Sequence, residues 1–450
     1  MQDSGNNCNQ GVRAMNIELD LRLPLIQDAE LKDKVVLVRV DHNVVKKGEI
    51  QDPYRIDATL ATLNHIVEHG GQLILMTHVG RPRDKKSGKI IVTDHTSVEP
   101  IAAYLEKKLR TRFPVPQFPV DPEAGIRQMD TSINALIQDL RARRIGGIYL
   151  PNTRWFEGEE AKDEKRDHLA LQLAGIADVF VNDAFGSWQP HASTVDVAKY
   201  LPSYAGILMQ NELIHLKQVL EPERPFVAVV AGAKYDTKIG PLNQIYKKVD
   251  HLLLGGVIYN AFLCAKYDVR MAGVDEADTT AAIELLRQDR QNKKIASLPF
   301  VIESDSLEER SEGTFRVRDI RDFKPGNTYG YLLDVAPESF DETEIAKVIA
   351  SARTILINAV MGFTPKFYEG SEKLYRTIDQ NKHARKLIGG GDTLQEFKNL
   401  NPDLYLAAMD DPKYYFFTGG GTVLKAIEQD TPYRLEPVKA LMDNAEKQLT

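Results

Sequence analysis

Residues 387–396 read LIGGGDTLQE, an apolar pair followed by three glycines and an Asp-Thr. Glycine loses more backbone freedom on folding than any other residue, so a triplet marks a tight turn or a close approach to the main chain. Thr393 and Glu396 have the spacing of a capping box, which predicts a helix start there. A strand, glycines and a helix start together would offer backbone N–H groups to an anion. Taken alone, however, a tight strand-to-helix turn without a ligand is the simpler explanation.

A second glycine triplet has the same setting. Residues 418–428 read TGGGTVLKAIE, and we again predict a strand before the glycines and a helix after them. We call residues 389–391 the first glycine elbow and residues 419–421 the second. Neither is a P-loop, because the motif G-x-x-x-x-G-K-[ST] is absent from the sequence. Two such elbows in one half of the chain favour a phosphate-binding purpose over chance.

Composition excludes several classes of protein. The 450 residues suit two domains, and contents of 43% hydrophobic and 27% charged residues are typical of a soluble globular protein. The net charge of −7 argues against a general nucleic-acid binder, and no apolar run is long enough to span a bilayer. Cys8 and Cys264 alone give neither a disulfide framework nor a zinc pattern. We therefore expect a cytoplasmic protein without nucleic-acid or membrane partners, with a flexible polar extension over residues 1–22.

Short apolar runs alternate with amphipathic stretches along the chain. The strand candidates are residues 35–40, 72–78, 147–151, 178–183, 226–231, 251–256, 329–335 and 354–358. One helix candidate, 55–69, carries apolar residues on one face: Ile56, Leu60, Leu63 and Val67. Near-continuous apolar strands separated by helices indicate parallel sheets covered on both sides. The strand–helix order restarts after a helical stretch at 211–225, so we predict an α/β fold of two Rossmann-like domains.

Polar residues gather after the strands of the first half, at the edge where open parallel sheets bind ligands. They are Arg39, Asp41, Asn43, Arg55, His78, Arg81 and Arg154. The planar fork of arginine matches carboxylate and phosphate groups, so this set predicts a small ligand with several negative charges. One alternative is that Arg39 merely pairs with Asp41. Another is that Arg81 and Arg83 form a solvated loop face.

The second half places Lys234 and Lys238 four residues apart, just after a predicted strand. At helical spacing both ammonium groups can face one direction and neutralise charge on a phosphoryl group in transfer. The alternative is two ordinary surface lysines. An arginine-rich half and a half with lysines and glycine elbows suggest a two-substrate transferase, in which domain closure brings two anionic substrates together.

Seven segments, taken in order, resemble the phosphoglycerate kinase family: VVLVRVDHNVV, MTHVGRP, DVFVNDAFG, HASTV, AGAKYDTKIG, LLLGG and IGGGDT. The resemblance runs from about Leu23 to about Asn444 and implies two lobes joined by a hinge helix. It implies a phosphoglycerate-binding domain at 23–208, a nucleotide-binding domain at 209–432, and a segment at 433–450 that returns toward the first domain. The implied reaction is reversible phosphoryl transfer between 1,3-bisphosphoglycerate and ADP, giving 3-phosphoglycerate and ATP. It belongs to glycolysis and gluconeogenesis and requires Mg²⁺.

The resemblance also implies roles for individual residues. Those that would bind the phosphoglycerate are Arg39, Asp41, Asn43, His78, Arg81 and Arg154. Those that would act in catalysis are Arg55, Lys234, Lys238, Gly390 and Gly391. Those that would bind the nucleotide are Lys238, Gly255, Gly256, Asn358, Gly390, Gly391, Asp392 and Thr393, with Asp392 on the metal side. Transfer would be in line, without a covalent enzyme intermediate or a general base, in a monomeric enzyme.

The chain departs from the family pattern near both predicted sites. After Val181-Asn182 it reads DAFGSWQPHAS, one residue shorter, with Trp188, Gln189 and Pro190 where the family has a His-Arg pair. One phosphate-holding arginine is therefore absent, which would weaken substrate binding by about tenfold or more. Pro365 stands where the family has a glutamate for the ribose hydroxyls.

Three functions agree with this pattern. The first is an active, divergent phosphoglycerate kinase. The second is a binding or regulatory protein that keeps the fold and catalyses weakly or not at all. The third is a kinase for a related acyl phosphate or another nucleotide. The joint presence of Arg55, Lys234, Lys238 and Asp392 favours catalysis, because a scaffold gains nothing from converging charges.

Overall fold

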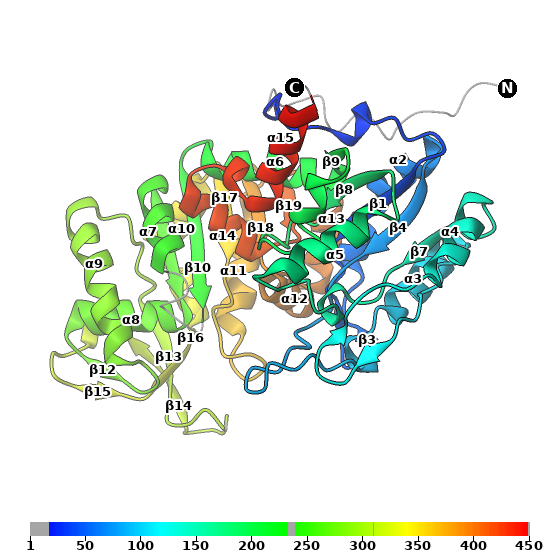
Figure 1. Cartoon of the computed structure of the whole chain (residues 1–450). Helices are drawn as coiled ribbons and strands as arrows, with labels where there is room; N and C mark the ends of the chain where they lie inside the picture. The colour runs from blue at the N-terminus through cyan, green and yellow to red at the C-terminus, as the bar shows by residue number, and fades with distance from the viewer. Residues whose placement is uncertain (1–17, 233–238, 309, 449–450) are drawn as a thin grey trace. The chain divides into compact units, whose positions relative to one another are not determined.

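The structure, a computed structural model, describes residues 18–232, 239–308 and 310–448. Its described residues form two compact units. The N-terminal unit comprises Glu18–Ile214 and the described residues from Pro432 onward, and the C-terminal unit comprises His215–Thr431. The division falls inside helix α6 (Ile207–Leu220). Each unit contains a five-stranded parallel sheet with helices along it (Figure 1), so the predicted α/β class is confirmed.

The sheet of the N-terminal unit has the strand order β7-β4-β1-β8-β9. Its strands are β1 (Val35–Val40), β4 (Gln72–Met76), β7 (Gly147–Tyr149), β8 (Val179–Asp183) and β9 (Ser203–Ala205). The helices before α6 are α1 (Tyr54–Ala58), α2 (Leu60–Glu68), α3 (Glu99–Leu109), α4 (Ile133–Arg141) and α5 (Glu164–Ala174). Two small hairpins are formed by β2 (Val45–Lys46) with β3 (Glu49–Ile50) and by β5 (Val120–Asp121) with β6 (Gly125–Ile126).

Strand β1 is the centre of this sheet. Val36 pairs with Leu73 of β4 on one side and with Val179 of β8 on the other. Every residue of β1, β4 and β8 is buried, which requires cover on both faces of the sheet. The chain runs from β1 to β4 and β7 on one side and then returns to β8 on the other. The carboxyl ends of β1 and β8 therefore form a topological switch point, where α/β sheets bind ligands.

The sheet of the C-terminal unit has the order β11-β10-β17-β18-β19. Its strands are β10 (Phe226–Gly232), β11 (His251–Gly255), β17 (Thr354–Asn358), β18 (Arg385–Gly389) and β19 (Tyr414–Phe417). Its helices after α6 are α7 (Ile239–Lys248), α8 (Gly256–Tyr267), α9 (Glu276–Asn292), α10 (Thr343–Ser351), α11 (Glu369–Gln380), α12 (Gly391–Leu400), α13 (Pro402–Met409) and α14 (Gly420–Gln429). Here the switch point lies between β10 and β17.

The candidate strand at 329–335 differs from expectation. Gly330 divides it into β15 (Thr328–Tyr329), which pairs with β12 (Arg270–Met271), and β16 (Tyr331–Val335). Strand β16 lies in a separate antiparallel sheet with β13 (Phe300–Ser304) and β14 (Phe315–Asp319). A side chain at Gly330 would meet the Ser304 carbonyl oxygen at 2.5 Å, so the glycine permits this close approach. An apolar run does not by itself distinguish the two kinds of sheet.

The single helix expected at 55–69 is wrong. Thr59 separates α1 from α2, and its hydroxyl donates to the carbonyl oxygen of Ile56 at 2.8 Å. In the second segment Ile66 is buried, while Val67, expected on the apolar face, is 49% exposed. The helix expected at 211–225 starts earlier and ends at Leu220, before the two prolines.

The last described helix, α15 (Glu436–Gln448), belongs to the N-terminal unit. The Asn444 amide donates to the carbonyl oxygen of Ala198 at 2.7 Å and accepts from the backbone N–H of Ser203 at 3.1 Å. Among the described helices, none has both the length and the apolar character needed to cross a membrane.

Candidate functional site

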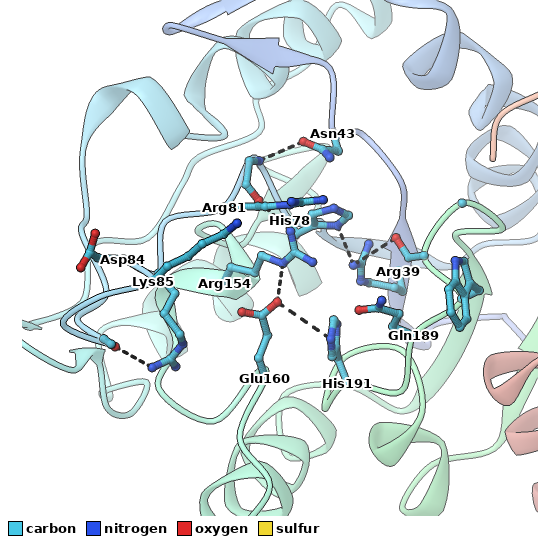
Figure 2. Close-up of a pocket in the computed structure, with 16 residues that line it drawn as sticks. Arg39, Asn43, His78, Arg81, Asp84, Lys85, Arg154, Glu160, Gln189 and His191 are labelled. Carbon is cyan, nitrogen blue, oxygen red and sulfur yellow. Dashed lines mark hydrogen bonds and ion pairs between the residues drawn. The ribbon is translucent and has the colours of Figure 1, made fainter. Parts of the chain in front are cut away.

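A cavity of about 740 Å³ lies in the N-terminal unit, among the loops that follow the strands of its sheet. Five predicted substrate residues line it: Arg39, Asn43, His78, Arg81 and Arg154. Glu160, Trp188, Gln189 and His191 line it as well (Figure 2). Four segments distant in sequence thus contribute to one cationic pocket. We call it the arginine pocket.

Arg39 is the buried residue at the floor of the arginine pocket. It is the penultimate residue of β1 and is fully buried, and its Nε donates to the Ser193 hydroxyl at 2.9 Å. Its Nη2 lies 3.1 Å from Nδ1 of His78. The alternative that Arg39 only pairs with Asp41 is wrong, because the Asp41 carboxylate lies 3.3 Å from the guanidinium of Arg55.

His78 is held as a neutral donor. Burial and then the charges of Arg39 and Arg154 keep the pKa of His78 well below its usual range. Arginine can only donate, so Nδ1 of His78 accepts from Arg39 and the proton of the neutral ring is on Nε2. The pocket therefore contains a neutral imidazole that donates one N–H and does not change its charge near neutral pH.

Arg154 lies on the short 3-10 helix Thr153–Trp155 and reaches the pocket from β7's side. Its Nη1 donates to the Gly80 carbonyl oxygen at 2.7 Å, and its Nε lies 2.9 Å from Glu160. The Asn152 side chain accepts from the backbone N–H of Arg154 at 3.0 Å and from that of Val79 at 3.0 Å. Arg154 is therefore positioned by the loop that also carries His78.

Asn43 and Arg81 complete the predicted set. The Asn43 amide oxygen accepts from the backbone N–H of Gly80 at 2.9 Å, which joins the loops after β1 and β4. Arg81 is exposed and makes no hydrogen bond or ion pair with any other described residue. Its solvent exposure agrees with the loop-face alternative, while its place in the lining leaves its guanidinium available to a ligand.

Arg55 and Asp41 lie outside the residues that line the pocket. Arg55 is on α1, and its partner Asp41 directly follows β1. Between Asp41 and Asn43, His42 is buried and joins Tyr149 at 2.9 Å to Thr59 at 3.0 Å. Burial lowers the pKa of His42 to about 3, so this histidine is neutral. Sequence reasoning missed His42, because one histidine beside an Asp and an Asn gives no sign of burial.

Glu160 and His191 were also missed. Glu160 contacts Arg154, and His191 lies 3.9 Å from Glu160 through Nε2. The signal that could have found Glu160 is its position six residues after Arg154, in GEE, beyond a strand end. Without a carboxylate, the pocket would concentrate arginine charge with no internal compensation.

The first glycine elbow has the predicted strand–turn–helix form in the C-terminal unit. Gly390 has φ +115°, a region open mainly to glycine, and it is the N-cap of α12. The expectation that Thr393 begins the helix is wrong, since α12 starts two residues earlier, at Gly391. Glu396 is buried and accepts from the Tyr375 hydroxyl at 3.1 Å instead of capping. The first N–H groups of α12 have no partner within the helix, as an anion site requires.

The second glycine elbow packs directly on the first. A side chain at Gly420 would lie 2.4 Å from Cα and 2.5 Å from N of Gly390, so glycine is needed for the two backbones to meet. Asn358, at the end of β17, is buried beside both, with its amide 3.5 Å from the Gly420 carbonyl oxygen. Helices α12 and α14 thus begin next to each other, and their positive ends reinforce one another.

The remaining predicted nucleotide residues have varied surroundings. A side chain at Gly255 would meet Sδ of Met361 at 2.4 Å, and one at Gly256 would meet the Gly232 carbonyl oxygen at 2.9 Å. Close packing within the protein already accounts for these two glycines, and their nucleotide contact stays a prediction. Asp392 is exposed on the first turn of α12. Lys234 and Lys238 lie outside the described residues.

Two parallel α/β units, one with a cationic pocket and one with paired helix N-termini, form the arrangement expected of a two-domain phosphotransferase. The family model described as phosphoglycerate kinase matches residues 26–430. The phosphoglycerate kinase of Roseiflexus sp. (strain RS-1) is 34% identical over 415 residues, covering 90% of this chain and 95% of that protein. The phosphoglycerate kinase of Dictyoglomus turgidum is 31% identical over 421 residues, covering 91% and 95%. The solved structure of phosphoglycerate kinase from Coxiella burnetii has a TM-score of 0.71 at 28% identity, covering 94% and 100%.

The chain belongs to the phosphoglycerate kinase family. The family, the two-domain fold and the phosphotransferase class predicted from the sequence are therefore confirmed.

Proposed function

We propose that this chain transfers a phosphoryl group between 1,3-bisphosphoglycerate and ADP, reversibly, as a cytoplasmic monomer. The observation that carries the proposal is the arginine pocket, which combines the expected cations with a neutral His78 donor in a chain of this family. A phosphate monoester has two negative charges and several acceptor oxygens, which these donors match.

In this proposal the N-terminal unit binds the phosphoglycerate. Arg39, His78, Arg81 and Arg154 hold its phosphate, and Asp41 and Asn43 hold its hydroxyl and carboxylate end. Arg55, aligned by its contact with Asp41, stabilises the transferring group. Because Arg55 is already 3.3 Å from a buried carboxylate, it stays ordered before any substrate arrives.

The C-terminal unit would bind the nucleotide at the two glycine elbows. The N–H groups at the start of α12 contact phosphate oxygens, with Gly390 as the N-cap and Gly391 and Thr393 in the first turn of the helix. Asn358 lies beside both elbows. In this proposal it contacts the nucleotide, and Gly255 and Gly256 contact the nucleotide as well. Lys234 and Lys238 are assigned by family resemblance to the charge of the transferring group.

Mg²⁺ fits this site as a companion of the nucleotide. Among the described residues, no three His, Cys, Asp or Glu side chains form a metal-binding group. The Asp392 carboxylate makes no hydrogen bond or ion pair with the described residues, so it can contribute one oxygen ligand. Mg²⁺ characteristically uses one or two carboxylates together with substrate phosphates and water. When bound, it would neutralise phosphate charge.

The chemistry needs no base from the protein. A β-phosphate oxygen of ADP attacks the acyl phosphorus, the bond between that phosphorus and the carboxylate oxygen breaks, and the carboxylate leaves. The attacking oxygen is already anionic and the leaving group departs without a proton, so the residues only position and stabilise charge. No His–Asp pair is required.

A coupled assay with 3-phosphoglycerate, ATP and Mg²⁺ tests the proposal. We expect turnover in the wild type and a loss of about a hundredfold or more in kcat for Arg55→Ala. A wild-type rate equal to that of Arg55→Ala would instead support the weakly catalytic or binding protein considered from the sequence. Parallel titrations with GTP and ATP measure the nucleotide preference, and size-exclusion chromatography measures the oligomeric state.

A further inference from the structure

The hairpin at residues 82–91 forms one rim of the arginine pocket. The backbone N–H of Asp84 donates to the carbonyl oxygen of Lys89 at 2.9 Å, and that of Ile91 donates to Pro82 at 2.9 Å. The Asp84 carboxylate accepts from the backbone N–H and the hydroxyl of Ser87, both at 2.7 Å. The hairpin is therefore held by its own bonds, and its acidic residue is occupied within the turn.

Lys85 is the cation of this hairpin that is directed into the pocket. It lines the cavity, and Figure 2 shows its chain extended toward Arg81 and Arg154, while Asp84 points away. Lys85 makes no hydrogen bond or ion pair with the other described residues. Arg83 by contrast donates to the Gly88 carbonyl oxygen at 2.9 Å. All three ammonium donors of Lys85 are thus available to a ligand.

The wall opposite the hairpin is poor in charge. Residues 187–190 supply a serine, a tryptophan, a glutamine and a proline. His191 follows them, and burial lowers the pKa of this histidine and so disfavours its charged form. The inner cations Arg39 and Arg154 already share their donors with Ser193, His78, Gly80 and Glu160. Arg81 and Lys85 are the lining cations that make no hydrogen bond or ion pair with any described residue.

We propose that Lys85 binds the non-transferred phosphate of the phosphoglycerate, supplying from the hairpin the charge that residues 187–190 do not supply. The proposal rests on the function proposed above and adds a residue to its substrate site. The flexible lysine stem lets the ammonium move onto a phosphate oxygen after the ligand has reached Arg39 and His78. A cation at this rim acts on substrate binding rather than on the transfer itself, because it contacts the end of the substrate that does not react.

Replacement of Lys85 by an uncharged residue of similar length tests the proposal. We expect Lys85→Met to raise KM for 3-phosphoglycerate by about tenfold, with kcat and the KM for ATP little changed. Lys86→Met is the matched control, because Lys86 is exposed in the same turn and does not line the pocket. It removes the same net charge, and we expect it to leave KM for 3-phosphoglycerate unchanged.

Two further variants separate a local contact from misfolding. Lys85→Arg should keep the wild-type KM, and Gln189→Arg introduced into Lys85→Met should restore part of it from the opposite wall. Calorimetric titration with 3-phosphoglycerate, without nucleotide, gives the same comparison independently of turnover. A wild type that binds 3-phosphoglycerate but does not phosphorylate it would refute the proposed function, and Lys85 would still be tested by affinity. Equal affinities for Lys85→Met and Lys86→Met would refute the role of Lys85.

Discussion

The arginine pocket and the paired glycine elbows present positive charge in different ways. In the N-terminal unit the donors are side chains from four segments, and their ends are fixed by contacts such as that of Arg39 with Ser193. In the C-terminal unit the donors are main-chain N–H groups at the starts of α12 and α14, and what the sequence supplies is the absence of side chains. One surface depends on which groups are present and the other on which are missing.

This difference predicts how each surface tolerates change. A side-chain cation can be replaced by another cation reaching from a different loop, as we propose for Lys85 and the wall at 187–190. A backbone donor has no such substitute, because Gly420 lies where any side chain would meet the main chain of Gly390. The comparison with the family pattern agrees with this: the segment at 187–190 departs from it, while the first glycine triplet keeps the family's IGGGDT pattern.

The largest effect is expected from Gly420→Ala. The added methyl would be 2.4 Å from Cα of Gly390, so the two elbows must separate and their N–H groups lose their alignment. We expect turnover to fall by about a hundredfold or more, together with a higher KM for ATP. Steady-state kinetics in both substrates measures this.

Gly389→Ala is the matched control for that variant. Its methyl would have no neighbour nearer than 3.6 Å, which is an ordinary contact. We expect it to retain most of the wild-type turnover. If both alanine variants lost activity equally, the requirement would be for glycine-like flexibility rather than for the contact between elbows.

A smaller effect is expected from Arg154→Met in the arginine pocket of the N-terminal unit. The substitution removes one charge-assisted donor and leaves Glu160 without its guanidinium at 2.9 Å. We expect KM for 3-phosphoglycerate to rise by about tenfold, with KM for ATP unchanged. Arg112→Met, which removes an exposed arginine outside the pocket, is the control. If Arg154→Met raised KM for 3-phosphoglycerate and KM for ATP equally, the pocket would not act on one substrate alone.

Much of the two parallel sheets could be predicted from the sequence, because buried parallel strands are nearly continuous apolar runs. The runs at 35–40 and 354–358 coincide with β1 and β17. The break at Thr59 was not predictable in this way, since a threonine is compatible with a helix interior. Only the packed structure shows that Ile66 rather than Val67 is buried. The antiparallel β16 was missed for a similar reason: its apolar run carries no information about strand direction.

In the site, the sequence correctly identified charged residues whose position directly after a predicted strand indicated where they lie. Arginines and a histidine at strand ends converge, because parallel strands bring their carboxyl ends to one edge. His42 escaped notice, since its role depends on Tyr149, which is 107 residues away. Lys85 escaped as well, because a lysine in a polar turn resembles any solvated residue until the turn is placed beside the pocket.

The smallest effect is a difference in the pH response of the two units. Burial raises the pKa of Glu396 and that of Asp334 to about 7 in the C-terminal unit. A carboxyl group whose pKa is raised on folding binds more protons in the folded state. Its contribution is therefore complete below its unfolded pKa and is lost as the pH rises through about 7. In the N-terminal unit, burial raises the pKa of Asp183 to about 7 but lowers that of His42 to about 3.

His42 therefore contributes to the free energy of unfolding with the opposite sign. Its contribution is lost as the pH falls below the pKa of the unfolded histidine, so it partly cancels the pH response of Asp183. Raising the pH from 6 to 7 should cost the C-terminal unit on the order of 1 kcal/mol of unfolding free energy through Glu396 alone, and the N-terminal unit less. Hydrogen exchange of peptides from β18 and from β1 measures the two responses separately. Glu396→Gln, which keeps an acceptor for Tyr375, should flatten the response of β18 and leave that of β1 unchanged. A response of β18 that survives this substitution would place the titrating group elsewhere, with Asp334 the next residue to replace.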